Sequence, residues 1–167
     1  MTLWLRLAVV AAAAATVWGV ALSQAAGETR LPIGALVPGA VITQPFGCTS
    51  VPLEPFDPLC PSRHVHTGVD LAAPYGTAVR AATAGVAHVG YDASAAGLYV
   101  VVAAGTNVRV LYCHLFTTAV ASGQAVRAGD YIGTIGSSGL ATGPHLHFEI
   151  QVGRRSVDPG QWLAAGS

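Results

Sequence analysis

Short apolar runs separated by turn-forming residues fill the chain from Leu31 onward, and they constrain its fold more than any other feature. Glycine, proline, asparagine and aspartate interrupt these runs, and no segment keeps the 3.6-residue period of an amphipathic helix. Four runs have the length of a strand: 86–91, 98–104, 108–115 and 145–152. The segments 92–97 and 105–107 are rich in turn residues and can join the first three runs. We therefore expect an all-β fold with a single antiparallel β-sheet domain.

Two further segments complete the expected layout. The segment 123–136 predicts two short strands around a tight turn, and 115–122 has room for one turn of helix. The sequence contains neither internal repeats nor a low-complexity linker. We expect one domain at 41–163, preceded by a short segment at 26–40 and followed by a tail at 164–167.

Residues 1–25 differ in kind from the rest of the chain. An arginine lies near the start, an uncharged run covers 7–22, and small residues follow at 23–26. These are the three parts of a secretory signal peptide, with Ala25 as the last residue removed. Retention of residues 3–22 as a membrane anchor is the alternative, although the uncharged run is short for a span of about 20 residues. Both alternatives place the remainder outside the cytoplasm, secreted or in the cell envelope, with membrane contact only if the segment is retained.

The cysteine spacing agrees with an oxidising compartment. Cys48 and Cys60 enclose a loop with three prolines, which cannot form a regular element. A disulfide across this loop would stabilise the fold by roughly 2–4 kcal/mol. A zinc site built from the two cysteines is the competing interpretation, but their separation matches no usual metal-binding spacing. We expect the disulfide, which leaves Cys113 unpaired.

Charge and composition exclude several classes of function. The chain has eight basic and eight acidic residues and a formal net charge of zero, so it lacks the basic surface of a nucleic-acid-binding protein. All eight basic residues are arginines. The absence of lysine excludes Schiff-base enzymes, P-loop nucleotide binding and the biotinyl or lipoyl carrier domains, each of which needs a lysine.

The segment His66-Thr-Gly-Val-Asp70 carries the first two candidate metal ligands. Its β-branched residues and its glycine, followed by Pro74, favour an extended or looped backbone over a helix. In such a backbone Gly68 lets the side chains of His66 and Asp70 turn toward a common point. Imidazole and carboxylate groups are both ordinary zinc ligands.

Residues 145–152 alternate strictly between polar and apolar side chains. A strand with this period carries four polar residues on one face: His145, His147, Glu149 and Gln151. Its other face carries four apolar residues: Leu146, Phe148, Ile150 and Val152. Two imidazoles would therefore be neighbours above the sheet, although the exposed face of an edge strand would show the same pattern.

The strand predicted at 108–115 adds a fifth candidate. The two-residue period places His114 on the same face as Tyr112. It places Cys113 on the opposite face, together with Leu115. We therefore expect Cys113 to be a small buried hydrophobic residue on the core side of the strand.

These segments together resemble the lysostaphin-type zinc metallopeptidases, the LytM family of cell-wall endopeptidases, over about residues 41–163. Residues 66–79 resemble the family's first metal motif, and Tyr112-Cys-His-Leu115 resembles its Tyr-x-His-Leu motif. Its most specific signature is similar to Gly136-Ser-Ser-Gly-Leu-Ala-Thr-Gly-Pro-His-Leu-His-Phe-Glu149. Three motifs in the family's order make a chance resemblance improbable.

The resemblance implies a monomeric zinc endopeptidase, with a metal cleft between loops, that hydrolyses peptide bonds in peptidoglycan stem peptides or cross-bridges. It implies one zinc ion per chain, held by His66, Asp70 and His147. It implies that His114 and His145 are catalytic and that one of them is the general base for a metal-activated water. A non-catalytic relative, which binds cell wall or activates a partner hydrolase, is the alternative, but such relatives typically lack some of these five residues.

The sequence departs from the family in the insertion at 48–60, which we expect to form one wall of the cleft. Two histidines lie outside the motifs: we expect His64 at the surface and His88 in a structural position. Glu149 shares the predicted face of His147, so it either orients that imidazole or points into solvent.

Overall fold

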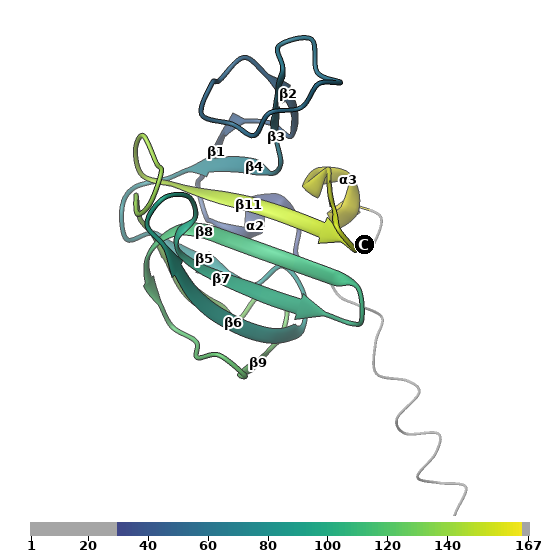
Figure 1. Cartoon of the computed structure of the whole chain (residues 1–167). Coiled ribbons are helices and arrows are strands. Elements are labelled where there is room, and N and C mark those ends of the chain that lie inside the picture. The colour runs from purple at the N-terminus through teal and green to yellow at the C-terminus, as the bar shows by residue number, and fades with distance from the viewer. Residues whose placement is uncertain (1–29, 165–167) are drawn as a thin grey trace, which may run out of the picture.

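The computed structural model describes residues 30–164 (Figure 1). The candidate signal peptide or membrane anchor at 1–25 lies outside the described residues. Within the described range, no helix is both long enough and apolar enough to cross a membrane.

Antiparallel strands provide most of the regular secondary structure in the described chain, and they form two sheets. The larger, ten-stranded sheet contains β1 (Val41–Gln44), β4 (Val69–Ala72), β5 (Ala78–Arg80), β6 (Gly85–Asp92), β7 (Gly97–Ala104), β8 (Val108–Thr118), β9 (Ala125–Val126), β10 (Tyr131–Ile135), β11 (His145–Val152) and β12 (Arg155–Val157). The smaller sheet contains β2 (Gly47–Thr49) and β3 (His64–His66), and the two short helices are α2 (Ile33–Leu36) and α3 (Pro159–Ala164). Every recorded strand pairing is antiparallel, which confirms the expected all-β fold.

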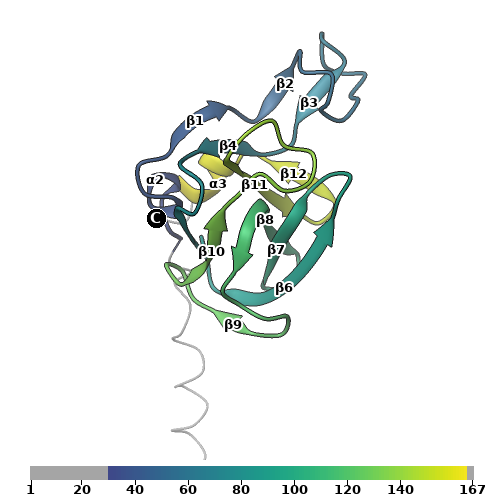
Figure 2. The same ribbon diagram turned by 90° about the vertical axis from the view of Figure 1, so that its left-hand side faces the viewer.

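The long strand β8 organises the larger sheet because it changes partner along its length. The main strand order is β1-β4-β11-β8-β7-β6-β9. One edge of β8 pairs with β7, while its other edge pairs first with β11, over Val108–Cys113, and then with β10, over Leu115–Thr118. Figure 2 shows β10 and β11 beside β8. His114 lies between the two paired stretches.

The apolar face of β11 packs into the main core, as its alternation predicts. Leu146, Phe148 and Ile150 are fully buried there. Phe148 lies opposite Tyr112 of β8, and their ring centroids are 5.3 Å apart. Val152, at the end of the strand, is partly exposed instead. The other face of β11 is thereby directed away from the core and toward the metal-ligand candidates.

The predicted faces of β8 are wrong at its centre because the strand contains a β-bulge. Cys113 pairs with His147, so it lies on the polar face of the sheet, whereas Tyr112 and Leu115 lie in the core. His114 has a positive φ of 63°. Two residues of β8, Cys113 and His114, therefore stand opposite the single residue Tyr99 of β7. The extra residue breaks the two-residue period and brings His114 to the same face as Cys113.

One smaller expectation is also wrong. The helical turn expected at 115–122 is absent, because β8 continues through Thr118 and pairs there with β10. The segment 123–136 forms the two expected short strands, β9 and β10, around a tight turn, in which the Asp130 N–H donates a hydrogen bond of 3.1 Å to the Arg127 carbonyl oxygen. Both strands pair with distant segments: β9 with β6, and β10 with β5 and β8.

The expected disulfide joins Cys48 to Cys60, with their Cα atoms 5.3 Å apart. It closes a segment that we call the disulfide lobe, residues 47–66, which contains β2 and β3 and projects beyond β1 and β4 (Figure 1). Its apolar side chains are largely exposed: Leu53 (58%), Phe56 (66%) and Leu59 (90%). Since these residues form no core, the lobe depends on its disulfide and its backbone hydrogen bonds.

We predict that Tyr112→Phe destabilises the fold although its ring stays in place. The backbone N–H of Ala82 donates a hydrogen bond of 2.7 Å to the buried Tyr112 hydroxyl, and the variant leaves this donor unsatisfied. We expect the free energy of unfolding, measured with urea, to fall by about 1–3 kcal/mol. Tyr131→Phe removes a half-exposed hydroxyl and should change little. Equal effects of the two variants would contradict a role for the Ala82 hydrogen bond.

We also predict one free thiol per chain in protein denatured without reductant, because Cys113 alone is unpaired. In the native protein this thiol should react slowly, since only 4% of its surface is exposed and burial raises its pKa to about 12. The check is thiol titration before and after denaturation. Three thiols after denaturation, in protein recovered from outside the cytoplasm, would refute the disulfide.

Candidate metal centre and catalytic cleft

Three side chains from separate strands converge on one point: His66 at the end of β3, Asp70 in β4 and His147 in β11. Asp70 Oδ1 lies 3.1 Å from His66 Nε2 and 3.0 Å from His147 Nδ1. The two imidazole nitrogens are 3.0 Å apart. The structure thus brings together the three residues that the sequence predicted as ligands.

Backbone pairing positions the side chains of Asp70 and His147, and Gly68 lets the connection that carries His66 pass close to them. Asp70 and His147 are direct partners in the antiparallel ladder between β4 and β11. Gly68 lies between β3 and β4, where a Cβ atom would come within 2.5 Å of the Phe148 carbonyl oxygen and 2.9 Å of the His147 ring. A larger residue at 68 would push this connection away from His147 and separate His66 from the other two ligands.

A polar partner on the far side of each ring fixes the nitrogen that faces the centre. His66 Nδ1 lies 2.9 Å from the carbonyl oxygen of Pro45, so it must carry the proton, and Nε2 keeps its lone pair. His147 Nε2 faces Glu149 Oε2 at 3.6 Å, which leaves Nδ1 facing the centre. The outer partners of the two rings thus direct two lone pairs toward Asp70.

Glu149 is buried, which excludes the solvent-facing alternative. Its carboxylate accepts hydrogen bonds from three side chains: Thr67 (3.0 Å), Gln151 (2.8 Å) and Ser156 (2.6 Å). Burial by itself would raise the pKa of Glu149, but its hydrogen bonds outweigh this effect and lower the pKa to about 2. Glu149 therefore stays ionised beside His147 Nε2. Its negative charge stabilises a cation bound at Nδ1, on the other side of the ring.

The electrostatics of the three converging groups favour a cation. Burial opposes ionisation of Asp70, yet hydrogen bonds with His147 and His66 hold its pKa below the usual value. Burial likewise opposes a proton on His147, but Asp70 and Glu149 raise its pKa to about 9. A carboxylate and two imidazoles that lie this close need a shared positive charge, which either a proton or a metal ion can supply.

The donor set fits a zinc ion. Tetrahedral zinc, with Zn–N and Zn–O distances of about 2.0–2.2 Å, has ligand atoms about 3.3 Å apart, close to the separations of 3.0–3.1 Å seen here. Two neutral imidazoles and one carboxylate are typical ligands of catalytic zinc, and three protein ligands leave a fourth position for water or substrate.

His114 and His145 flank this centre as a pair, with ring centroids 4.7 Å apart. His114 Nδ1 lies 2.8 Å from the Ser138 carbonyl oxygen, and His145 Nδ1 lies 2.8 Å from that of Gly143. Because carbonyls only accept, both Nδ1 atoms carry protons, and in the neutral form of each ring Nε2 keeps the lone pair. His145 Nε2 lies 3.9 Å from Asp70 Oδ1, on the open side of the centre.

His114 is held neutral. Burial, together with the neighbouring His145 and His147, lowers its pKa to about 4, against the opposing effect of the hydrogen bond to Ser138. A neutral imidazole with a free Nε2 can accept a proton at neutral pH.

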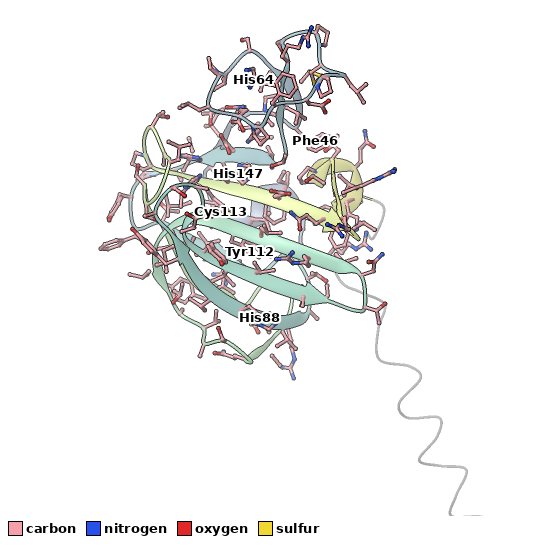
Figure 3. The ribbon with its side chains drawn as sticks, viewed as in Figure 1. Phe46, His64, His88, Tyr112, Cys113 and His147 are labelled. Atoms are coloured by element: carbon pink, nitrogen blue, oxygen red, sulfur yellow. A yellow bond between two sulfur atoms is a disulfide. The ribbon has the colours of Figure 1, made fainter. Side chains whose placement is uncertain are left out.

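Asp70, His114, His145 and His147 line the floor of a cleft of about 330 Å³, whereas His66 is fully buried. The disulfide lobe forms one wall with Val51, Leu53, Glu54 and Pro55, and Leu140 and Thr142 also line the cleft. The cleft wall expected from the insertion at 48–60 is therefore present. Cys113 lines the floor near His147 (Figure 3), which corrects the expectation that it lies on the core side.

The two remaining histidines lie away from the metal centre. His64 is in β3, within the lobe, where it is half-buried and bonds the Glu54 carbonyl oxygen through Nδ1 at 2.8 Å. His88 is exposed on β6, far from His147 in Figure 3. His64 is thus less exposed than expected and has a structural role in the lobe.

The sequence did not identify the groups that orient the histidines, because most of them are backbone carbonyls. Pro45, Ser138 and Gly143 act only through their carbonyl oxygens, so residue type carries no signal for them. The exception is Glu149, whose place on the His147 face the alternation of β11 indicated.

Comparison with known proteins identifies relatives of this chain. Residues 64–159 match the family described as Peptidase family M23. The DD-carboxypeptidase/endopeptidase Mpg of Neisseria meningitidis is 38% identical over 118 residues, which cover 71% of this chain and 26% of that protein. The peptidoglycan DD-endopeptidase ShyA of Vibrio cholerae is 41% identical over 93 residues, 56% of this chain and 22% of that protein. The chain thus spans about a quarter of the length of these relatives.

Solved structures share the fold. A zinc-containing peptidase from Vibrio cholerae aligns with a TM-score of 0.65 at 30% identity, over 78% of this chain and 40% of that chain. The catalytic domain of lysostaphin from Staphylococcus simulans aligns with a TM-score of 0.63 at 28% identity, over 75% of this chain and 92% of that domain. With a family match over more than half of its length, the chain belongs to peptidase family M23.

Proposed function

We propose that the chain is a zinc-dependent endopeptidase that hydrolyses peptide bonds in peptidoglycan stem peptides or cross-bridges. The observation that carries this proposal is the convergence of His66, Asp70 and His147 within 3.0–3.1 Å, beside two imidazoles whose Nε2 atoms are free. The names of the relatives, peptidoglycan DD-endopeptidases among them, supply the substrate class.

His66, Asp70 and His147 hold one zinc ion per chain in this proposal. Zinc at such a site polarises the scissile carbonyl and makes water a stronger acid. His66 and His147 present lone pairs whose direction is fixed by Pro45 and Glu149, so no ligand has to rotate before binding.

His114 and His145 move protons on the open side of the centre. One of the two Nε2 atoms takes a proton from the attacking water and later delivers it to the leaving amine. The other imidazole donates a hydrogen bond to the oxyanion that develops on the scissile carbonyl, and for this its Nε2 must carry a proton as well as its Nδ1. Both rings are held by carbonyl oxygens on the side away from the substrate, so proton transfer does not disturb their orientation.

The same proposal places the protein outside the cytoplasm, with residues 1–25 as a signal peptide or a retained anchor. The Cys48–Cys60 disulfide supports this location, because such bonds persist in oxidising compartments. We propose that the domain at 41–163 acts there on peptidoglycan as a monomer.

The first prediction concerns the metal. The purified protein should contain one zinc per chain, and Asp70→Ala should lose most of it, because the centre then lacks its only carboxylate ligand. Elemental analysis after dialysis measures the zinc content. Asp92→Ala removes an exposed carboxylate outside the cleft and should keep the full zinc content. Stoichiometric zinc in an Asp70→Ala/His147→Ala double variant would contradict the ligand assignment.

The second prediction separates catalysis from metal binding. His114→Ala and His145→Ala should keep zinc but slow hydrolysis by roughly 10²–10⁴-fold, the usual contribution of acid–base catalysis. Peptidoglycans of several cross-link types provide the assay, with mass spectrometry of the new termini. His88→Ala replaces an exposed histidine and should leave the rate unchanged.

Three outcomes would revise the assignment. Loss of zinc from His145→Ala, with retention in His147→Ala, would reverse the roles of these two histidines. Unchanged hydrolysis in His114→Ala would remove that residue from the mechanism. Zinc-loaded protein that binds peptidoglycan and cuts none of the cross-link types would instead favour the non-catalytic alternative.

A further inference from the structure

The cleft wall formed by the disulfide lobe carries a carboxylate that the proposed chemistry does not use. Glu54 lines the cleft together with two other acidic residues, Asp70 and Glu149. Asp70 is a proposed zinc ligand, and Glu149 is occupied by its hydrogen bonds and by His147. Within residues 30–164, the one side-chain hydrogen bond recorded for the Glu54 carboxylate comes from Gln44.

The backbone around Glu54 is fixed relative to the cleft. The carbonyl oxygen of Glu54 accepts a hydrogen bond of 2.8 Å from His64 Nδ1. The neighbouring Pro55 carbonyl accepts one of 3.0 Å from the Val65 N–H. Both donors belong to β3, the strand that ends in His66, and the disulfide closes the same lobe. The position of Glu54 is therefore tied to the strand that carries a proposed zinc ligand.

The side chain of Glu54 is held by a hydrogen bond to a neighbouring strand. Gln44 Nε2 donates a hydrogen bond of 2.9 Å to Glu54 Oε1. Gln44 belongs to β1, where it is the pairing partner of Asp70. This contact holds the Glu54 carboxylate beside β1, the strand that pairs with the strand of Asp70. It leaves Oε2 of Glu54 available to a further donor.

Charge in the cleft makes the preferred donor a cation. Within the described chain, neither arginine nor lysine lines the cleft, and no ion pair of Glu54 with a basic residue is recorded. A half-buried carboxylate with a fixed position and no counter-ion attracts a positively charged group that can donate hydrogen bonds. The apolar residues beside it, Val51 and Leu53, suit the aliphatic chain on which such a group is carried.

We propose that Glu54 is a specificity-determining residue that binds a protonated amino group on the substrate peptide, close to the bond that is cut. The proposal rests on the peptidase function proposed above and adds a preference within its substrate class. A stem peptide with a diamino acid offers such a group wherever its second amine is not acylated. Substrates whose amine is acylated lose this contact and leave Glu54 without a partner.

Two matched peptides test the proposal. They share one sequence with a diamino acid next to the scissile bond, and they differ only in whether its side-chain amine is free or acetylated. The zinc-loaded protein should have a kcat/KM about 5- to 30-fold higher for the free amine, the range expected for one charge-assisted hydrogen bond in a partly exposed site. Glu54→Gln, which keeps the shape and loses the charge, should reduce this ratio to near one.

Asp57→Asn is the matched control, because Asp57 lies in the same lobe and does not line the cleft. It removes the same charge, and it should keep the ratio of the wild-type protein. A ratio near one in the wild-type protein, or an equal drop in both variants, would overturn the assignment of Glu54. Zinc content and the thiol count of each variant show whether the metal site and the lobe remain intact.

A binding measurement separates this proposal from the peptidase function itself. The dissociation constants of the two peptides, measured by fluorescence anisotropy on the zinc-loaded wild-type protein and on Glu54→Gln, do not require hydrolysis. If neither peptide is cut but the free amine binds more tightly through Glu54, the peptidase proposal fails and the amine site stands. If both are cut at equal rates and bind equally, the amine site fails and the peptidase proposal stands.

Discussion

The antiparallel pairing of β4 with β11 is the constraint on which the site depends. It sets Asp70 opposite His147, so that two of the proposed ligands meet without any loop having to position them. The register of this pairing is fixed by the core, because Leu146 and Phe148 are buried on the other face of β11. A slip of one residue would move the apolar side chains toward the cleft and the imidazoles into the core. Hydrophobic packing on one face of the sheet therefore determines the geometry of polar groups on the other.

Much of this arrangement could be predicted from the sequence where the two-residue period holds. The alternation in β11 gave the correct faces for His145 and His147, and the short apolar runs gave the central strands within a few residues. The pairing of Cys48 with Cys60 followed from the oxidising context and the proline-rich loop between them. These features are local, so the order of residues along the chain carries enough information to place them.

The remaining features depend on contacts between distant segments. His114 reaches the cleft because β8 exchanges one partner strand for another at that residue, and the resulting bulge cannot be read from residues 108–115 alone. Counting by twos across the bulge placed Cys113 on the wrong face. The pairing of β9 with β6 likewise depends on a strand that precedes it by more than thirty residues. Local patterns predict which segments are strands, and the whole sheet decides where their side chains point.

The disulfide lobe leaves the domain and returns to it at neighbouring points, since Gly47 and His66 are partners in its two-stranded sheet. It has no core of its own, and none of its residues belongs to the main core. Such an insertion can vary in length and composition with little effect on the folding of the body that carries it. One protein scaffold can thus be adapted to different ligands by exchanging a single closed segment, in the way that antibody frameworks accept new loops, while the proposed metal ligands in the body of the domain stay unchanged.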